Sequence, residues 1–117
     1  MGGWPRQFVI VTACNPRGEI VDAERNESLD RELSALLEVK GLVHCRMTGG
    51  SPEGSHREPG YLVECDWEVG LELGRRFEQV AIYGVVDGEL YLVDCQDGKQ
   101  TPVAMWASRY KGRLPEG

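Results

Sequence analysis

The pattern of hydrophobic and polar positions predicts strands in the first half of the chain. FVIVTAC at 8–14 is apolar on both faces, as a central strand usually is. LVHCRM at 42–47 predicts a second strand, and YLVEC at 61–65 alternates and predicts a third. Between these two strands lies TGGSPEGSHREPG, residues 48–60, whose glycines and prolines favour a loop.

The second half of the chain carries the pattern of a hairpin. VAIYGVV at 80–86 and ELYLVDC at 89–95 are two β-rich runs. They are joined by Asp87-Gly88, the type of pair favoured in two-residue type I′ turns. TPVAMWAS at 101–108 predicts one further short strand.

Two segments have the period of an amphipathic helix. In residues 26–41 the leucines recur on one stripe, and Gly41 fits the position just after a helix end. We expect Asn26 or Ser28 to be the N-cap of this helix. Residues 67–79 predict a second helix, which follows an aspartate suited to an N-cap.

The order of these elements predicts the fold class. Two β-α-β units that interleave through a hairpin are typical of the split β-α-β (ferredoxin-like) sandwich. We therefore expect an α+β fold, with an antiparallel sheet, two helices on one face and an extra C-terminal hairpin. A length of 117 residues indicates a single domain. Its core is expected over about 6–107, followed by a mobile tail at 108–117.

Charge and hydropathy narrow the possible partners. The net charge of −6 argues against non-specific nucleic-acid binding, which depends on Lys and Arg neutralising phosphates. No apolar run is long enough to span a membrane, and the start MGGWPRQ lacks the pattern of a signal peptide. We therefore expect a cytoplasmic protein that has no membrane partner.

The four cysteines lie in or at the end of strand-like segments. They are Cys14, Cys45, Cys65 and Cys95, and no two of them form a Cys-x-x-Cys pair. Buried thiols that behave as small hydrophobic groups are the expected reading, and a disulfide or a structural metal is the alternative. The chain also lacks His-x-x-x-His and Asp-x-Asp patterns, so we expect neither a metal nor a cofactor.

The predicted topology brings polar residues from distant parts of the chain to the end of the sheet where the first strand ends. They come from the exit of that strand, the start of the first helix, the loop before the third strand and the start of the fourth. These residues are Asn15, Asn26, His56, Arg57, Glu58 and Gln79. The helix N-terminus adds free N–H groups at the same place, which favours an anionic ligand.

Most of these residues also have a purely structural explanation. Asn15-Pro16 is an ordinary exit from a strand, because asparagine favours turns and proline ends a ladder. Asn26 fits a helix cap. Glu58 fits a solvated loop charge, and Gln79 fits a residue that satisfies backbone groups before the fourth strand.

Two of the functions that fit this set of residues use a site at the end of the sheet. The preferred one is binding of a small anionic or nucleotide-like ligand, with the amides fixing its orientation and Arg57 supplying charge. The alternative is a small metal-independent hydrolase or transferase. In that enzyme Glu58 would act as general acid or base, and His56 or Arg57 would stabilise developing negative charge. Cys14 is the one conceivable nucleophile.

A protein-interaction module is the third reading. It would act through the sheet face or through edge strands that are left unpaired. Trp4, Trp106 and Tyr110 lie near the termini and could cover that face or mediate homodimerisation through it.

Four segments of the chain together resemble a family of small bacterial proteins known as domain of unknown function 3293. The segments are FVIVTACNP, ERN, REPGYLV and RRFEQVAIYG, and the resemblance covers residues 8 to about 95. The residues that match the family pattern are Thr12, Ala13, Asn15, Pro16, Asn26, Glu58, Phe77, Gln79 and Ala81. Cys14 replaces an aromatic residue, and Gly60 stands where serine is usual. The resemblance implies a shared architecture and site, and it implies no reaction.

Overall fold

The computed structural model describes the backbone of residues 5–50 and 57–106, and the side chains in these ranges other than those of residues 48–50, 57 and 58. The strands are β1 (Gln7–Val11), β2 (His44–Gly50), β3 (Arg57–Val63), β4 (Ala81–Val86), β5 (Glu89–Asp94) and β6 (Gln100–Met105). The helices are α1 (Ala23–Lys40) and α2 (Trp67–Arg76), with a 3-10 helix η1 (Pro16–Gly18) after β1. The predicted α+β class is confirmed. The expected mobile tail at 108–117 lies outside the described residues.

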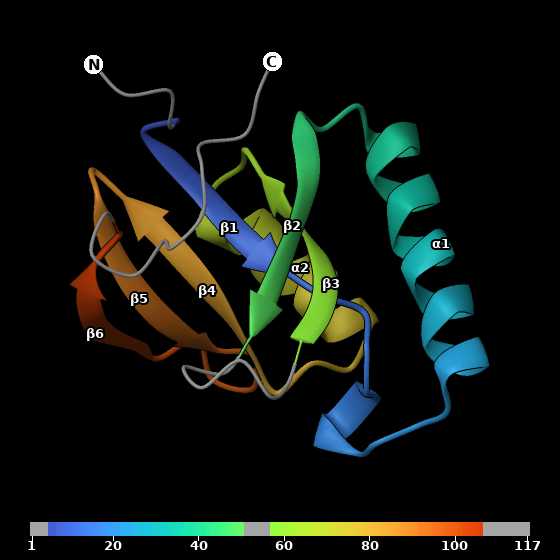
Figure 1. The fold of residues 1–117 in the computed structure, drawn as a ribbon. Coiled ribbons are helices and arrows are strands. Elements are labelled where there is room, and N and C mark those ends of the chain that lie inside the picture. Colours follow the sequence, from blue (N-terminus) through green and yellow to red (C-terminus); the bar gives the residue numbers. More distant parts are fainter. Residues whose placement is uncertain (1–4, 51–56, 107–117) are drawn as a thin grey trace.

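The strands form one antiparallel sheet (Figure 1). Its six strands lie in the order β2-β3-β1-β4-β5-β6. Strand β1 is central, because Val9 lies opposite Val63 of β3 on one side and opposite Gly84 of β4 on the other. Both faces of β1 are covered, since Phe8 and Val9 point to opposite faces and are both fully buried. The apolar run at 8–14 therefore predicted the central strand correctly.

Both helices pack on the same face of the sheet (Figure 1). Helix α1 buries Leu29, Leu33 and Leu37, the stripe expected from the sequence, and α2 adds Leu73. These side chains join Val9, Val11, Tyr61, Val63, Ile82 and Val93 of the strands in one core cluster. Neither of the described helices is long and apolar enough to cross a membrane.

The expected N-cap of the first helix is wrong. Helix α1 begins at Ala23, and Asp22 is its cap, because the Asp22 side chain accepts a 2.7 Å hydrogen bond from the N–H of Arg25. The hydrophobic stripe begins only at Leu29, so the polar first turns of the helix carry no periodic signal. Asn26 lies inside the helix, which leaves its side chain available for another contact.

The β2–β3 hairpin is longer than the sequence suggested. Residues 48–50 and 57–60 belong to the strands, and Thr48 lies opposite Pro59. Residues 57–60 pair with β2 alone, since β1 pairs with β3 only from Tyr61 onward. A proline lacks an N–H, so it is tolerated in a strand that is paired along one edge.

The face of the sheet opposite the helices, which we call the outer face, carries a second apolar cluster. Its buried members are Phe8, Leu62, Val85, Leu90 and Trp106, and Ile10, Cys45 and Met47 pack against them. The expected β4–β5 turn is present, with positive φ angles at Asp87 and Gly88. The expected short last strand is also present as β6.

Candidate functional site

Two asparagines tie the exit of β1 to helix α1. The backbone N–H of Asn15 donates to Oδ1 of Asn26 at 2.9 Å, and Nδ2 of Asn26 donates to Oδ1 of Asn15 at 3.1 Å. The backbone N–H of Val21 donates to the same oxygen of Asn15 at 3.1 Å. The predicted convergence of these two residues is therefore observed, and their bonds fix the path of the chain between β1 and α1.

Gln79 reaches the same place from the segment between α2 and β4. Its Nε2 donates to the backbone carbonyl oxygen of Cys14 at 3.0 Å and to that of Phe77 at 3.2 Å. The sequence argument therefore located Gln79 correctly beside the end of β1. Both of these contacts satisfy backbone oxygens, which was the structural explanation for this residue.

The other predicted site residues belong to the part of the chain with no described side chains. His56 lies outside the described residues. Arg57 and Glu58 are described only as backbone, at the start of β3. The predicted catalytic roles of Glu58 and His56 and the predicted ligand contact of Arg57 stay predictions.

Asn26→Ala is expected to lower the free energy of unfolding by about 2 kcal/mol, because it removes two hydrogen bonds and leaves the partly buried N–H of Asn15 without its acceptor. Urea unfolding followed by circular dichroism measures this change. Glu27→Ala is the control, since Glu27 is the exposed neighbour on the same helix. An Asn26 variant as stable as the control would contradict the structural role.

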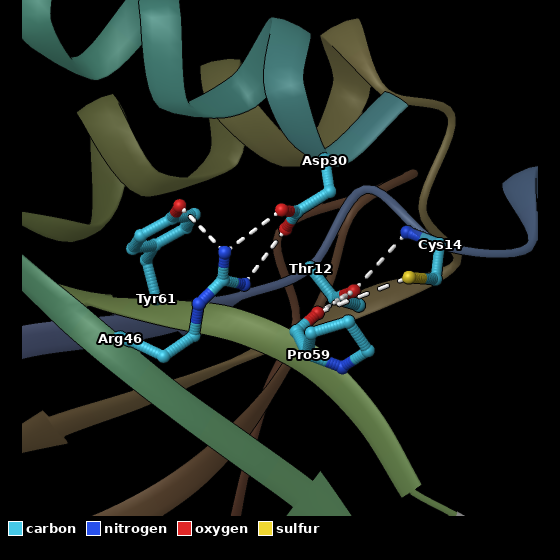
Figure 2. A network of polar contacts seen from close by, with 6 residues as sticks. All are labelled: Thr12, Cys14, Asp30, Arg46, Pro59 and Tyr61. Carbon is cyan, nitrogen blue, oxygen red and sulfur yellow. Dashed lines mark hydrogen bonds and ion pairs between the residues drawn. The ribbon is translucent and has the colours of Figure 1, made fainter. Parts of the chain in front are cut away.

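Between α1 and the β2–β3 hairpin lies an ion pair that the sequence did not predict (Figure 2). Nη1 and Nη2 of Arg46 each donate to one carboxylate oxygen of Asp30 at 2.8 Å. Nη2 also donates to the Tyr61 hydroxyl at 2.9 Å, and the guanidinium lies 4.4 Å from the Tyr61 ring centroid. The hydrogen bonding that Arg46 donates to Asp30 raises the pKa of Arg46, against the effect of partial burial. The guanidinium therefore stays charged and joins the helix to the edge strand.

The end of β1 contacts β3 in the same region (Figure 2). The Thr12 hydroxyl donates to the carbonyl oxygen of Pro59 at 2.8 Å and accepts from the N–H of Cys14 at 3.1 Å. The Cys14 thiol lies 3.8 Å from the same carbonyl oxygen. Cys14 is buried, so it packs as the small hydrophobic group that the sequence suggested.

A hollow of about 370 Å³ opens beside the junction that Gln79 makes. The polar residues that line it are Arg17, Arg75, Glu78, Gln79, Asp94 and Gln96. Arg17 is paired with Glu78 at 2.5 Å. Arg75 donates through Nε to the carbonyl oxygen of Cys95 at 2.5 Å, and within the described residues its two terminal amino groups make no hydrogen bond. Arg75 thus offers a fixed guanidinium with unused donors.

The backbone beside this hollow holds an unusual conformation. Asn15, Arg17 and Glu78 have φ angles of 50°, 61° and 56°, in the left-handed region that non-glycine residues rarely adopt. Arg17 and Glu78 are joined there by a backbone hydrogen bond of 2.6 Å from N–H to carbonyl oxygen. Such conformations cost on the order of 1 kcal/mol each and concentrate at functional sites. The sequence carried no signal for Arg17 or Glu78.

A second hollow of about 280 Å³ lies on the other side of Glu78. Arg25 of α1 and Arg76 of α2 line it together with Glu32 and Phe77. Within the described part of the chain, Arg25 and Arg76 form no ion pair. Arg75 and Arg76 are therefore adjacent exposed arginines that line different hollows.

Cys95, which lines the first hollow, and Cys65, which follows β3, are thiols poorly suited to act as nucleophiles. Burial, together with the charge of Asp66, raises the pKa of Cys65 to about 12. Burial also raises the pKa of Cys95, against the opposing effect of Arg75. Both thiols are protonated at neutral pH, and the thiolate is the reactive form.

The described side chains of residues 5–47 and 59–106 contain no group of His, Cys, Asp and Glu that could hold a metal ion.

Comparison with known proteins gives one result. The model of the family described as "Protein of unknown function (DUF3293)" matches residues 11–82, which is more than half of the chain. No curated protein and no solved structure matches this chain. The matched range contains Asn15, Asn26 and Gln79, so the junction at the end of β1 lies within the part that the family shares. The resemblance seen in the sequence is thus confirmed, and the chain belongs to the DUF3293 family.

Proposed function

We propose that the protein binds a small ligand carrying an anionic group, a phosphate or a carboxylate, in the 370 Å³ hollow beside the end of β1. The observation that carries this proposal is Arg75, which lines the hollow and whose guanidinium is held by the carbonyl oxygen of Cys95, with its two terminal amino groups unused among the described residues. Guanidinium groups bind carboxylates and phosphates through paired hydrogen bonds. The volume falls within the range of small-molecule sites.

The surroundings of Arg75 support the same function. Gln79 and Gln96 line the hollow with amide groups that can orient a ligand, and Arg17 and Glu78 line it from a backbone in the left-handed region. The charge of Glu78 is neutralised by Arg17. Asp94 accepts hydrogen bonds from the N–H groups of Gln96 and Asp97, so its carboxylate serves the turn after β5. Among the described residues that line the hollow, Arg75 is therefore the positive charge left for a ligand.

The test is a thermal-shift screen with inorganic phosphate, nucleotides, sugar phosphates and small dicarboxylates. Wild type, Arg75→Gln and Arg76→Gln are compared, each against its own melting temperature. A ligand at 100 times its Kd adds about 2.7 kcal/mol, which is a shift on the order of 10 °C for a chain of this length. We expect the shift to disappear in Arg75→Gln and to remain in Arg76→Gln.

Arg76→Gln is a matched control because it removes the same charge from the same helix end. Potassium chloride at equal ionic strength controls for general screening. A panel that leaves the wild type unshifted would overturn the proposal. An equal shift in Arg75→Gln would also overturn it, and a shift lost only in Arg76→Gln would assign the ligand to the second hollow.

We further propose that the fold is of the split β-α-β type and that the protein works in the cytoplasm. The order β2-β3-β1-β4 and the position of each helix between strands separated by one neighbour support the first point. The net charge of −6 is compatible with the second. The alternative of a hydrolase or transferase that uses Glu58 and His56 stays a prediction.

A further inference from the structure

The second hollow, of about 280 Å³, is lined jointly by helix α1 and by the C-terminal end of helix α2. Arg25, Leu29 and Glu32 of α1 follow one another at intervals of four and three residues, so they share one face of the helix. Leu29 belongs to the buried core, so this is the face that packs on the sheet. Arg25 and Glu32 therefore lie about one turn before and one turn after a fixed point of the packed helix.

Charges of both signs line this hollow without neutralising one another. Arg76 adds a second guanidinium from the end of α2, and the charge of Glu78 is taken up by its ion pair with Arg17. In the described part of the chain, Glu32 forms no ion pair with Arg25 or with Arg76, although all three line the same hollow. Two guanidiniums and one carboxylate are therefore left for the charged groups of a ligand.

The remaining residues that line the second hollow are apolar. They are Pro16, Leu29 and Phe77, and all three are buried, so they form a fixed apolar surface between the charged groups. Methylene groups of a ligand gain free energy when such a surface shields them from water. The volume lies just below the roughly 300 Å³ at which sites for drug-sized ligands begin, so the hollow suits a smaller molecule.

We propose that the second hollow binds a free amino acid with an acidic side chain. Its two carboxylates pair with the guanidiniums of Arg25 and Arg76, which suit carboxylates through paired hydrogen bonds. Its ammonium group binds Glu32, and the same carboxylate repels ligands that carry negative charge alone. Every residue that lines this hollow lies within 11–82, the range that the family model matches. The site is separate from the hollow that Arg75 lines and does not depend on the function proposed there.

Isothermal titration calorimetry tests the proposal with L-glutamate and L-aspartate, and with glutarate and succinate, which lack only the ammonium group. We expect the wild type to bind each amino acid at least about tenfold more tightly than the matching dicarboxylate, because a contact between two charged groups is lost. Glu32→Gln should abolish this preference, and Arg25→Gln should weaken the binding of both amino acids at least about tenfold. Arg31→Gln is the matched control, since Arg31 is an exposed arginine of the same helix that lines neither hollow.

Several results would overturn this proposal. A wild type that binds neither amino acid, by calorimetry or by thermal shift, would do so, and so would equal affinities for L-glutamate and glutarate. Equal losses in Arg25→Gln and Arg31→Gln would show a general effect of charge. Binding of L-glutamate that is lost in Arg75→Gln and retained in Arg25→Gln would assign the ligand to the first hollow. Each replaced side chain is exposed, so the unliganded variants should keep the melting temperature of the wild type.

Discussion

Replacing Gly60 by alanine is expected to lower the free energy of unfolding by about 3 kcal/mol, because a Cβ at this position would lie 2.6 Å from the carbonyl oxygen of Val11. The obstacle is backbone of the central strand, so no side-chain rotation can relieve the collision. Strands β1 and β3 would have to separate where their pairing begins, at Val11 and Tyr61. Urea unfolding monitored by circular dichroism measures the loss.

Gly41→Ala is the matched control. Gly41 ends helix α1 with a φ of 67°, and a Cβ there would meet nothing within 4 Å. Its replacement should cost only the left-handed backbone penalty, about 1 kcal/mol. If Gly60→Ala is no more destabilising than Gly41→Ala, then β1 and β3 are further apart than the structure shows.

The same contact bears on serine, the residue expected at this position from the family resemblance. A serine has the same Cβ as alanine and would meet the same carbonyl oxygen. Gly60→Ser should therefore be as destabilising as Gly60→Ala. In this chain the Thr12 hydroxyl donates to the neighbouring carbonyl oxygen of Pro59 at 2.8 Å, so the close approach of the two strands is part of the site.

The sequence predicted the helices and turns correctly wherever the local pattern and the tertiary packing favour the same structure. The leucine stripe of α1 and the Asp87-Gly88 turn depend on neighbours in sequence, and both are observed. The helix start at Asp22 was missed because the polar first turns of α1 carry no hydrophobic period. The length of β3 was missed because a proline in a strand resembles a loop until its pairing with β2 is known.

The candidate site, like the fold, could be predicted from the sequence only in part. Asn15, Asn26 and Gln79 could be brought together from topology alone, because each lies at the end or start of a predicted element. Arg46 and Arg75 could not, since charged residues on a strand or a helix usually face solvent. Their partners, Asp30 and the carbonyl group of Cys95, lie 16 and 20 residues away in sequence. Only the three-dimensional packing decides which charged residues meet.

Leu33→Ala is expected to lower the free energy of unfolding by about 3 kcal/mol, because Leu33 is fully buried in the core under α1 and its loss leaves a cavity. Asp30→Ala removes the ion pair of the same helix. It should cost only about 1 kcal/mol, because the Arg46 side chain is 47% exposed and water can solvate it. Urea unfolding at low salt and in 1 M potassium chloride measures the loss of unfolding free energy in each of the two variants.

Salt separates the two contributions to the attachment of α1. The Asp30→Ala effect should shrink in 1 M salt, since the Debye length falls to about 3 Å, whereas the Leu33→Ala effect should persist. An Asp30→Ala loss that equals the Leu33→Ala loss would mean that the ion pair is the main attachment of the helix. We expect the Leu33→Ala loss to be the larger one, because the leucine stripe supplies most of the energy that holds α1 on the sheet. The hydrogen bonds of Arg46 to Asp30 and Tyr61 mainly fix the position of the edge strand β2 against α1.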